Sequence, residues 1–143
     1  MTITEAKSIK VGQFFTLWEF LESPKAKELG LISKQLEISD EAIENIKFLC
    51  SEILDRLRNQ FGPIAINSGY RCKELNEAVG GQATSQHCTG EAADIDTIDN
   101  ESVHKYIKNR LFYDQNINEY GFKWIHVSKR RNNKNRNMSF KIG

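Results

Sequence analysis

The sequence lacks long apolar runs, paired cysteines and a leader-like start. No apolar run approaches the roughly 20 residues that a transmembrane helix needs, so no membrane span is predicted. Cys50, Cys72 and Cys88 are an odd number of cysteines without a C-x-x-C motif, so we expect reduced thiols rather than disulfides or structural zinc. Lys7 and Lys10 are not followed by an apolar segment, so we expect no secretory signal peptide.

The chain also carries almost no net charge. Its 143 residues have a formal charge of +1, and 39% of them are hydrophobic. This length and apolar content predict a single domain, residues 1–143, with its own core. The one strongly basic run, residues 129–137, is interpreted as a solvated hairpin loop before a last strand. Contact of this run with nucleic acid or an anionic polymer is the alternative, which the near-neutral charge and the lack of a nucleic-acid-binding motif disfavour.

Two segments have the apolar periodicity of longer helices. The first covers roughly residues 40–60, where Ser39 and Asp40 offer N-caps. Its apolar residues recur at three- and four-residue steps: Ile43, Ile46, Leu49, Cys50, Ile53, Leu54 and Leu57. The second covers residues 100–111, capped by its first residue, and leaves His104 on the solvated side. Both are interpreted as structural helices with one face in the core.

Shorter helices are indicated by their termini. Thr16 and Glu19 form a capping-box pattern for a short helix. A further helix can begin at Pro24, which is tolerated at a first helical position, and end at Gly30. A short helix or turn is predicted at residues 73–79.

The strands are short and alternate apolar with polar residues. They are predicted at residues 64–67, at 92–96, around Ile117 and Glu119, at 124–127 and at 138–142. Asp94 and Asp96 would lie on one face of the second strand. Arg71 follows the first strand, where its guanidinium is either a surface charge or a planar fork for a carboxylate.

Two potential metal ligands lie close together in the stretch Ser85–Asp94. His87 and Asp94 are seven residues apart among small residues, just after Gly80-Gly81. His126 lies 32 residues beyond Asp94 in a predicted strand. Together they would form a three-ligand set that leaves a fourth tetrahedral position open to water, as in catalytic zinc. The alternative is that each is a hydrogen-bonded structural residue or a cap, and Cys88 is left out of the set because an extended segment would turn it away from its neighbour.

A larger group of motifs surrounds these residues in a fixed order. They are Ser68-Gly69-Tyr70-Arg71, Leu75-Asn76, Val79-Gly80-Gly81, Ser85-Gln86-His87, Gly90-Glu91-Ala92-Ala93-Asp94 and Trp124-Ile125-His126-Val127-Ser128. The pattern S-x-H-x-x-G-x-A-x-D followed by a distant W-x-H resembles the zinc D-alanyl-D-alanine carboxypeptidase family, which includes the vancomycin-resistance dipeptidase and several phage endolysins. The resemblance covers about residues 14–128.

The resemblance implies a fold and a set of roles. The expected fold is α+β, with a central antiparallel sheet flanked by helices and a zinc cleft on the sheet. Zinc would be held by His87, Asp94 and His126, and Arg71 and Ser85 would bind substrate. Family members cut peptide bonds in peptidoglycan stem peptides, many of them next to a D-amino acid.

The general base is where the chain departs from many relatives. These carry an acidic residue three positions before the last histidine ligand, but this chain has Lys123 there. Glu119 is the nearest upstream carboxylate, and relatives with a similar W-E-F/Y-G stretch carry a glutamate in a like place. Glu119 is therefore the predicted base, and the alternative is an exposed strand residue in a weak or inactive binder.

Three functions remain open at this point. The first is zinc-dependent hydrolysis of a peptidoglycan stem peptide, either carboxypeptidase-like or endolysin-like. The second is a zinc-bearing but inactive cell-wall-binding module, and the third is a phage structural protein that kept the fold. We expect a monomer that is made in the cytoplasm and reaches the wall after lysis or phage delivery.

Overall fold

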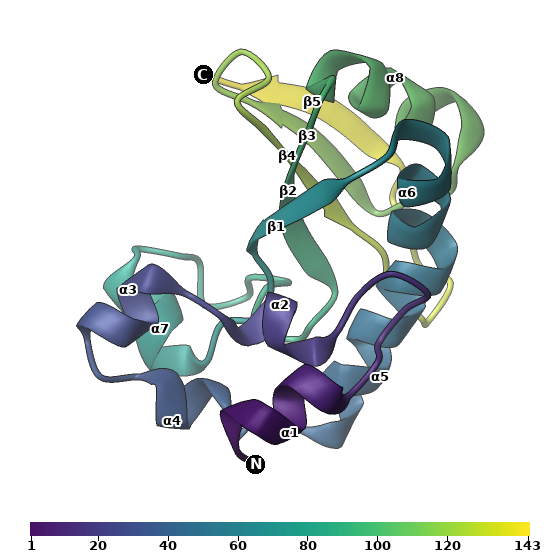
Figure 1. Ribbon diagram of the computed structural model, residues 1–143. Coiled ribbons are helices and arrows are strands. Elements are labelled where there is room, and N and C mark those ends of the chain that lie inside the picture. The colour runs from purple at the N-terminus through teal and green to yellow at the C-terminus, as the bar shows by residue number, and fades with distance from the viewer.

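The computed structural model describes residues 1–143 and contains one five-stranded sheet with helices packed against it (Figure 1). The strands are β1 (Ile64–Ser68), β2 (Ala92–Thr97), β3 (Gln115–Glu119), β4 (Trp124–Ser128) and β5 (Met138–Ile142). Their order across the sheet is β1-β2-β4-β3-β5. All five lie where the alternation of apolar and polar residues predicts strands, and the α+β class is confirmed.

The edge strand β5 differs from the expected arrangement. The pairs β1–β2, β2–β4 and β3–β4 are antiparallel, but β5 runs parallel to β3. Because β3 lies between β4 and β5, residues 129–137 cross the end of β3 and do not form a hairpin. Alternation within β5 fixes which side chains share a face, but it carries no information on the neighbouring strand.

The long predicted helix is present and is continuous through three segments. These are α5 (Asp40–Leu49), the π-helical turn η1 (Cys50–Leu54) and α6 (Asp55–Phe61). Ser39 caps the helix by accepting a hydrogen bond from the backbone N–H of Ala42 at 3.1 Å. An N-terminal loop packs closely on the π-helical turn, since a Cβ placed on Gly12 would lie 2.7 Å from the Cβ of Cys50.

Five short helices surround this scaffold. They are α1 (Ile3–Ser8), α2 (Leu17–Leu21), α3 (Pro24–Glu28), α4 (Ile32–Gln35) and α7 (Lys73–Ala78). The capping box before α2 is formed, and the carboxylate of Glu19 accepts a hydrogen bond from the backbone N–H of Thr16 at 2.7 Å. Pro24 begins α3 and Gly30, with φ of +70°, follows its end, as predicted. The sequence interpretation missed α1 and α4, which are too short to show a clear apolar period.

Helix α8 (Asn100–Arg110) corrects two expectations. Its N-cap is Asp99, whose side chain accepts from the N–H of Ser102, and not Asn100. His104 is not simply solvated, because its Nε2 lies 3.1 Å from the carbonyl oxygen of Asn116 on β3. A helical wheel drawn from apolar residues alone could not reveal this polar contact with the sheet.

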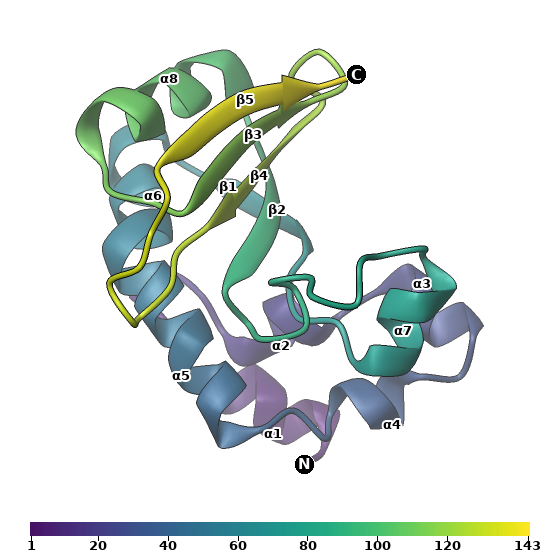
Figure 2. The ribbon, with the colours of Figure 1, turned by 180° about the vertical axis from the view of Figure 1, so that it is seen from behind.

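One face of the sheet is covered by the helices. Alternate side chains of β2 and β4 (Ala93, Ile95, Ile125 and Val127) have no exposed surface and join a core cluster of 22 residues with η1, α6 and α8. Figures 1 and 2 show the long helix running along one side of the sheet. Helices α3, α4 and α7 lie together beyond one end of the sheet. The opposite face of β2 and β4 presents polar residues. No helix is both long and apolar enough to cross a membrane.

Candidate active site

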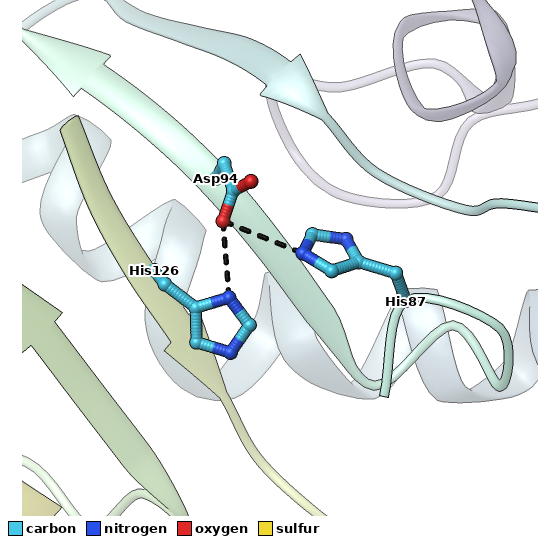
Figure 3. Close-up of side chains that lie close together, drawn as sticks. All are labelled: His87, Asp94 and His126. Carbon is cyan, nitrogen blue, oxygen red and sulfur yellow. Dashed lines mark hydrogen bonds and ion pairs between the residues drawn. The ribbon is translucent and has the colours of Figure 1, made fainter. Parts of the chain in front are cut away.

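Three side chains from separate parts of the chain meet on the polar face of the sheet (Figure 3). Asp94 on β2 and His126 on β4 are directly paired across the two strands, and His87 comes from the loop before β2. Asp94 Oδ1 lies 3.0 Å from His126 Nδ1 and 3.4 Å from His87 Nε2. One potential ligand atom from each residue lies within 4.8 Å of the others.

These distances suit a tetrahedral metal ion. Two ligand bonds of 2.0–2.1 Å at a tetrahedral angle separate their atoms by roughly 3.3 Å. The two separations from Asp94 Oδ1, 3.0 and 3.4 Å, are close to this value, and the ligand atoms of the two histidines lie within 4.8 Å of each other. Two imidazole nitrogens and one carboxylate oxygen are also the donor types that zinc accepts. The three residues could therefore hold a zinc ion without large movement of the backbone.

The orientation of His87 is fixed by its other ring nitrogen. His87 is buried, and its Nδ1 lies 2.7 Å from the carbonyl oxygen of Gly69. A carbonyl oxygen can only accept, so Nδ1 carries a proton and donates to it, and Nε2 is the ring nitrogen that faces Asp94 and could bind a metal ion. Gly69 itself packs closely against α2, because a Cβ there would lie 2.7 Å from the backbone of Phe20.

Asp94 is held in its ionised form. Burial by itself would raise the pKa of this carboxyl group, but hydrogen bonds from His126 and His87 outweigh burial and hold the pKa well below its ordinary value. The side chain is 16% exposed, so one side remains open to the cleft. Asp94 can therefore act as an anionic ligand across the neutral pH range.

A cleft of about 800 Å³ surrounds the three residues. Its lining contains every residue for which the sequence predicts a role: Arg71, Ser85, His87, Asp94, Glu119 and His126. It also contains Trp124 and two arginines from the C-terminal segment, Arg130 and Arg136. The cleft thus combines a metal-ligand cluster with carboxylate and guanidinium groups.

Comparison with family models shows to which protein family the chain belongs. The model of Peptidase M15 matches residues 14–128, which is most of the chain and includes the whole metal-ligand cluster. The chain belongs to the peptidase M15 family. A comparison with curated proteins gave no match. Membership in M15 supports a metallopeptidase, and the family's match ends before Arg130 and Arg136.

In this M15 peptidase, Arg71 is held by two side chains. Its Nη1 donates to Asn76 Oδ1 at 3.0 Å, and its Nε donates to Ser68 Oγ at 3.4 Å. Asn76 is buried and is itself fixed, since its amide donates to the carbonyl of Gln82 at 2.8 Å. A Cβ on Gly81 would lie 2.1 Å from Asn76 Oδ1, so only glycine leaves room for this arrangement. Arg71 is a positioned group and not a freely moving surface charge.

Glu119 and Lys123 have opposite surroundings. Glu119 ends β3 and lines the cleft, on the same strand face as Ile117, whose partner across the sheet is His126. The carboxylate of Glu119 accepts a hydrogen bond from the indole Nε1 of Trp124. Lys123 is exposed and does not line the cleft. Of these two residues, only Glu119 presents its side chain to the cleft.

Ser85 and Cys88 lie on the loop that carries His87. Ser85 lines the cleft, and its Oγ accepts a hydrogen bond from the N–H of His87 at 3.2 Å. Cys88 lies outside the metal-ligand cluster and outside the cleft lining. Burial raises the pKa of the Cys88 thiol, partly opposed by the charge of Arg71, which disfavours a thiolate. All three cysteines are free, in agreement with the prediction of reduced thiols.

The sequence interpretation missed a buried carboxylate beside the cleft and the side chains that contact it. The buried carboxylate of Asp114 contacts Gln86, Arg130 and Arg136, and none of the four was singled out. The basic run was noted, but nothing in its spacing indicates a buried partner 16 to 22 residues upstream. Asn76 and Gln86 both stood within quoted motifs, but neither was given a role.

Proposed function

We propose that the protein is a zinc peptidase that hydrolyses a peptide bond in bacterial peptidoglycan stem peptides. The observation that carries the proposal is a cluster of His87, Asp94 and His126 in a cleft that also holds Glu119 and Arg71. Membership in the peptidase M15 family supports the same reading. A metallopeptidase needs a metal site, a base and a group that positions the substrate, and this cleft has a candidate for each.

His87, Asp94 and His126 would hold the zinc ion. When bound, zinc supplies Lewis-acid chemistry, since it lowers the pKa of water to about 7 and polarises a carbonyl. The chain contributes ligands whose orientation is already fixed: Nδ1 of His87 is engaged with Gly69, and Asp94 is held as a carboxylate. Pre-oriented ligands reduce the cost of assembling the site when substrate binds.

Glu119 is the proposed general base and acid. Its carboxylate would accept a proton from the attacking water and return it to the departing amine. The indole of Trp124 holds the carboxylate at the cleft wall by donating to one oxygen, which leaves the second oxygen able to accept the proton. The position two residues along β3 from the partner of His126 keeps Glu119 close to the metal ligands.

Arg71 and Ser85 are the proposed substrate-binding residues. Arg71 uses Nε and one Nη for protein contacts, and its remaining N–H groups can bind a substrate carboxylate. Ser85 offers a hydroxyl donor at the cleft wall, because its oxygen accepts from the backbone while its hydrogen remains available. These contacts would place the scissile bond beside the metal ligands.

Digestion of defined muropeptides, followed by mass spectrometry, tests the proposal. Zinc-loaded protein should release a peptide or amino-acid fragment, and the His126→Ala variant should release none. The fragment's mass separates a carboxypeptidase, which removes a terminal residue, from an endopeptidase, which cuts within the stem or cross-bridge. If the zinc-loaded protein binds muropeptides but leaves them all intact, the hydrolase proposal is wrong and a cell-wall-binding or phage structural role takes its place.

A further inference from the structure

We propose that Arg130 and Arg136 form a second anion subsite of the cleft, which binds a substrate carboxylate two to four residues from the bond that is cut. The inference rests on the proposed function, because it takes the substrate to be a stem peptide. Both arginines line the same cleft as the metal ligands. Both lie beyond residue 128, where the match to the M15 family ends, so the subsite is a feature of this chain's own C-terminal segment.

The subsite is built on a buried carboxylate. Asp114 has no exposed surface, and it gathers the two arginines at one point. Arg136 donates through Nε at 3.0 Å and through Nη2 at 2.6 Å, and Arg130 Nε lies 3.4 Å from Asp114 Oδ2. Gln86, from the loop that carries His87, donates to the same carboxylate at 2.8 Å. Arg136 is therefore held by two side-chain hydrogen bonds and Arg130 by an ion pair before any ligand binds, which reduces the entropy lost on binding.

Hydrogen bonds also hold the loop between the two arginines. The side chain of Asn135 accepts from the backbone N–H of Arg130 at 2.7 Å and donates to its carbonyl at 3.1 Å. The backbone N–H of Arg136 donates to Asp114 at 2.9 Å. These bonds hold both arginines on the crossover segment at the cleft wall.

The charges at this end of the cleft do not cancel. Two guanidinium groups face one carboxylate, which leaves an excess of one positive charge. The only carboxylates that line the cleft are Asp94, in the candidate metal site, and Glu119, the proposed base. Arg130 is paired through Nε alone, so both terminal nitrogens of its fork can bind a second carboxylate. The side chains of Arg130 and Arg136 are 30% and 44% exposed, so a ligand can reach them.

Strand register sets how far the subsite lies from the metal ligands. Arg130 follows His126 by four residues along β4 and its extension, which spans at most about 13 Å at 3.3 Å per residue. Glu119 lies in the opposite direction, two residues along β3 from the residue paired with His126. A peptide with its scissile bond at the metal ligands would therefore reach the subsite after two to four residues. A free carboxyl group at that distance is the anion that a peptide substrate can supply.

Matched peptide substrates test the subsite. We would compare stem peptides that are identical except that one carboxyl group, two to four residues from the cleaved bond, is free or amidated. The parent should have a lower KM for the free acid. Arg130→Gln should raise that KM by roughly 10-fold or more, the scale of a charge-assisted hydrogen bond, and leave kcat and the amidated peptide nearly unchanged. Arg136→Lys should act in the same direction while keeping a positive charge beside Asp114.

Arg131→Gln is the matched control. Arg131 lies in the same loop, but its Nε donates to Asn45 and it does not line the cleft. This variant removes the same charge and should leave the KM of both peptides unchanged. Thermal unfolding of each variant identifies any that fails to fold, and Arg130→Gln is the least disruptive because Asp114 keeps its contacts with Arg136 and Gln86.

Two results would overturn the subsite while leaving the peptidase proposal intact. One is equal KM values of the parent for the free and amidated peptides. The other is an equal loss for both peptides in Arg130→Gln, which would indicate a structural role. If the parent cuts neither peptide, calorimetry measures the Kd of the parent and of Arg130→Gln for the same two peptides. Tighter binding of the free acid by the parent, lost in Arg130→Gln, supports the subsite. Equal Kd values for the two peptides, or no binding, reject it.

Discussion

At the scale of single residues, Glu119 is the proposed proton acceptor of the cleft. Its carboxylate is fixed by the indole of Trp124 and lines the cleft, whereas Lys123 points to solvent. A glutamine at position 119 can still accept the indole hydrogen bond, but it cannot take up a proton. One substitution can therefore separate the structural contact of this side chain from its proposed role as the base.

We expect Glu119→Gln to keep its zinc and its thermal stability but to lower kcat by roughly 100-fold or more, the usual contribution of a general base. Metal analysis and steady-state hydrolysis of a muropeptide measure the two properties. Lys123→Ala is the control, and it should retain the parent's rate because the lysine is outside the cleft. A Glu119→Gln variant with the parent's kcat would assign the base to another group.

Arg71 gives a second prediction at this scale. Arg71→Lys retains the positive charge but loses the planar fork and the contacts with Asn76 and Ser68. We expect zinc content and folding to match the parent, while kcat/KM falls by roughly 10-fold or more. Lys73→Arg, a charge-conserving exchange at an exposed neighbour, should leave kcat/KM unchanged. Parent-like kinetics of Arg71→Lys would remove Arg71 from the substrate site.

At the scale of elements, the crossover of residues 129–137 is attached to the sheet through Asp114. Burial tends to raise the pKa of this carboxyl group, but the hydrogen bonds and charge of Arg136 prevail and lower the pKa to about 2 from an ordinary value of 3.8. A carboxyl group with a lowered pKa stabilises the fold in its ionised form. Its contribution is complete above about pH 3.8 and is lost as the pH falls towards 2.

We therefore expect Asp114→Asn to lower the free energy of unfolding by roughly 1 to 2 kcal/mol at pH 6, after allowance for solvent screening of the arginines. At pH 2.5 the difference between parent and variant should be smaller. Urea unfolding monitored by circular dichroism at both pH values measures it. Glu28→Gln, which removes an exposed ion pair with Lys25, should change stability by less than about 0.5 kcal/mol. A difference that does not depend on pH would contradict the assignment to Asp114 ionisation.

At the scale of the whole molecule, the three candidate metal ligands come from three parts of the fold. His87 belongs to the loop after α7, Asp94 to the centre of β2 and His126 to β4. In the unfolded chain these residues are far apart, so zinc should bind the folded state preferentially. Preferential binding stabilises the fold by about 2.7 kcal/mol when free zinc is 100 times Kd.

We expect about one zinc per chain and an increase in Tm of roughly 5 to 10 °C on zinc addition. His87→Ala, Asp94→Ala and His126→Ala should each remove the bound zinc and the increase. Cys88→Ser is the control, because this thiol lies beside the loop histidine but outside the ligand cluster, and it should retain both. Stoichiometric zinc in all three ligand variants would show that the metal binds elsewhere.

The sequence by itself determined most of the local elements and named the candidate site residues. Ser39, the apolar period of residues 40–60 and the capping box at Thr16 predict their helices because caps and amphipathic faces depend on neighbours within one or two turns. The order of His87, Asp94 and His126 likewise predicts a ligand set before any contact is known.

Only the tertiary structure decided how distant segments meet. It placed β5 parallel to β3, turned Glu119 into the cleft and Lys123 away from it, brought His104 onto Asn116, and buried Asp114 under Arg130 and Arg136. Each of these depends on which strand lies next to which, and so on the balance of burial and pairing among residues distant in the chain. Local periodicity fixes the face on which a side chain lies, but the neighbour opposite that face is set by the packing of the whole fold.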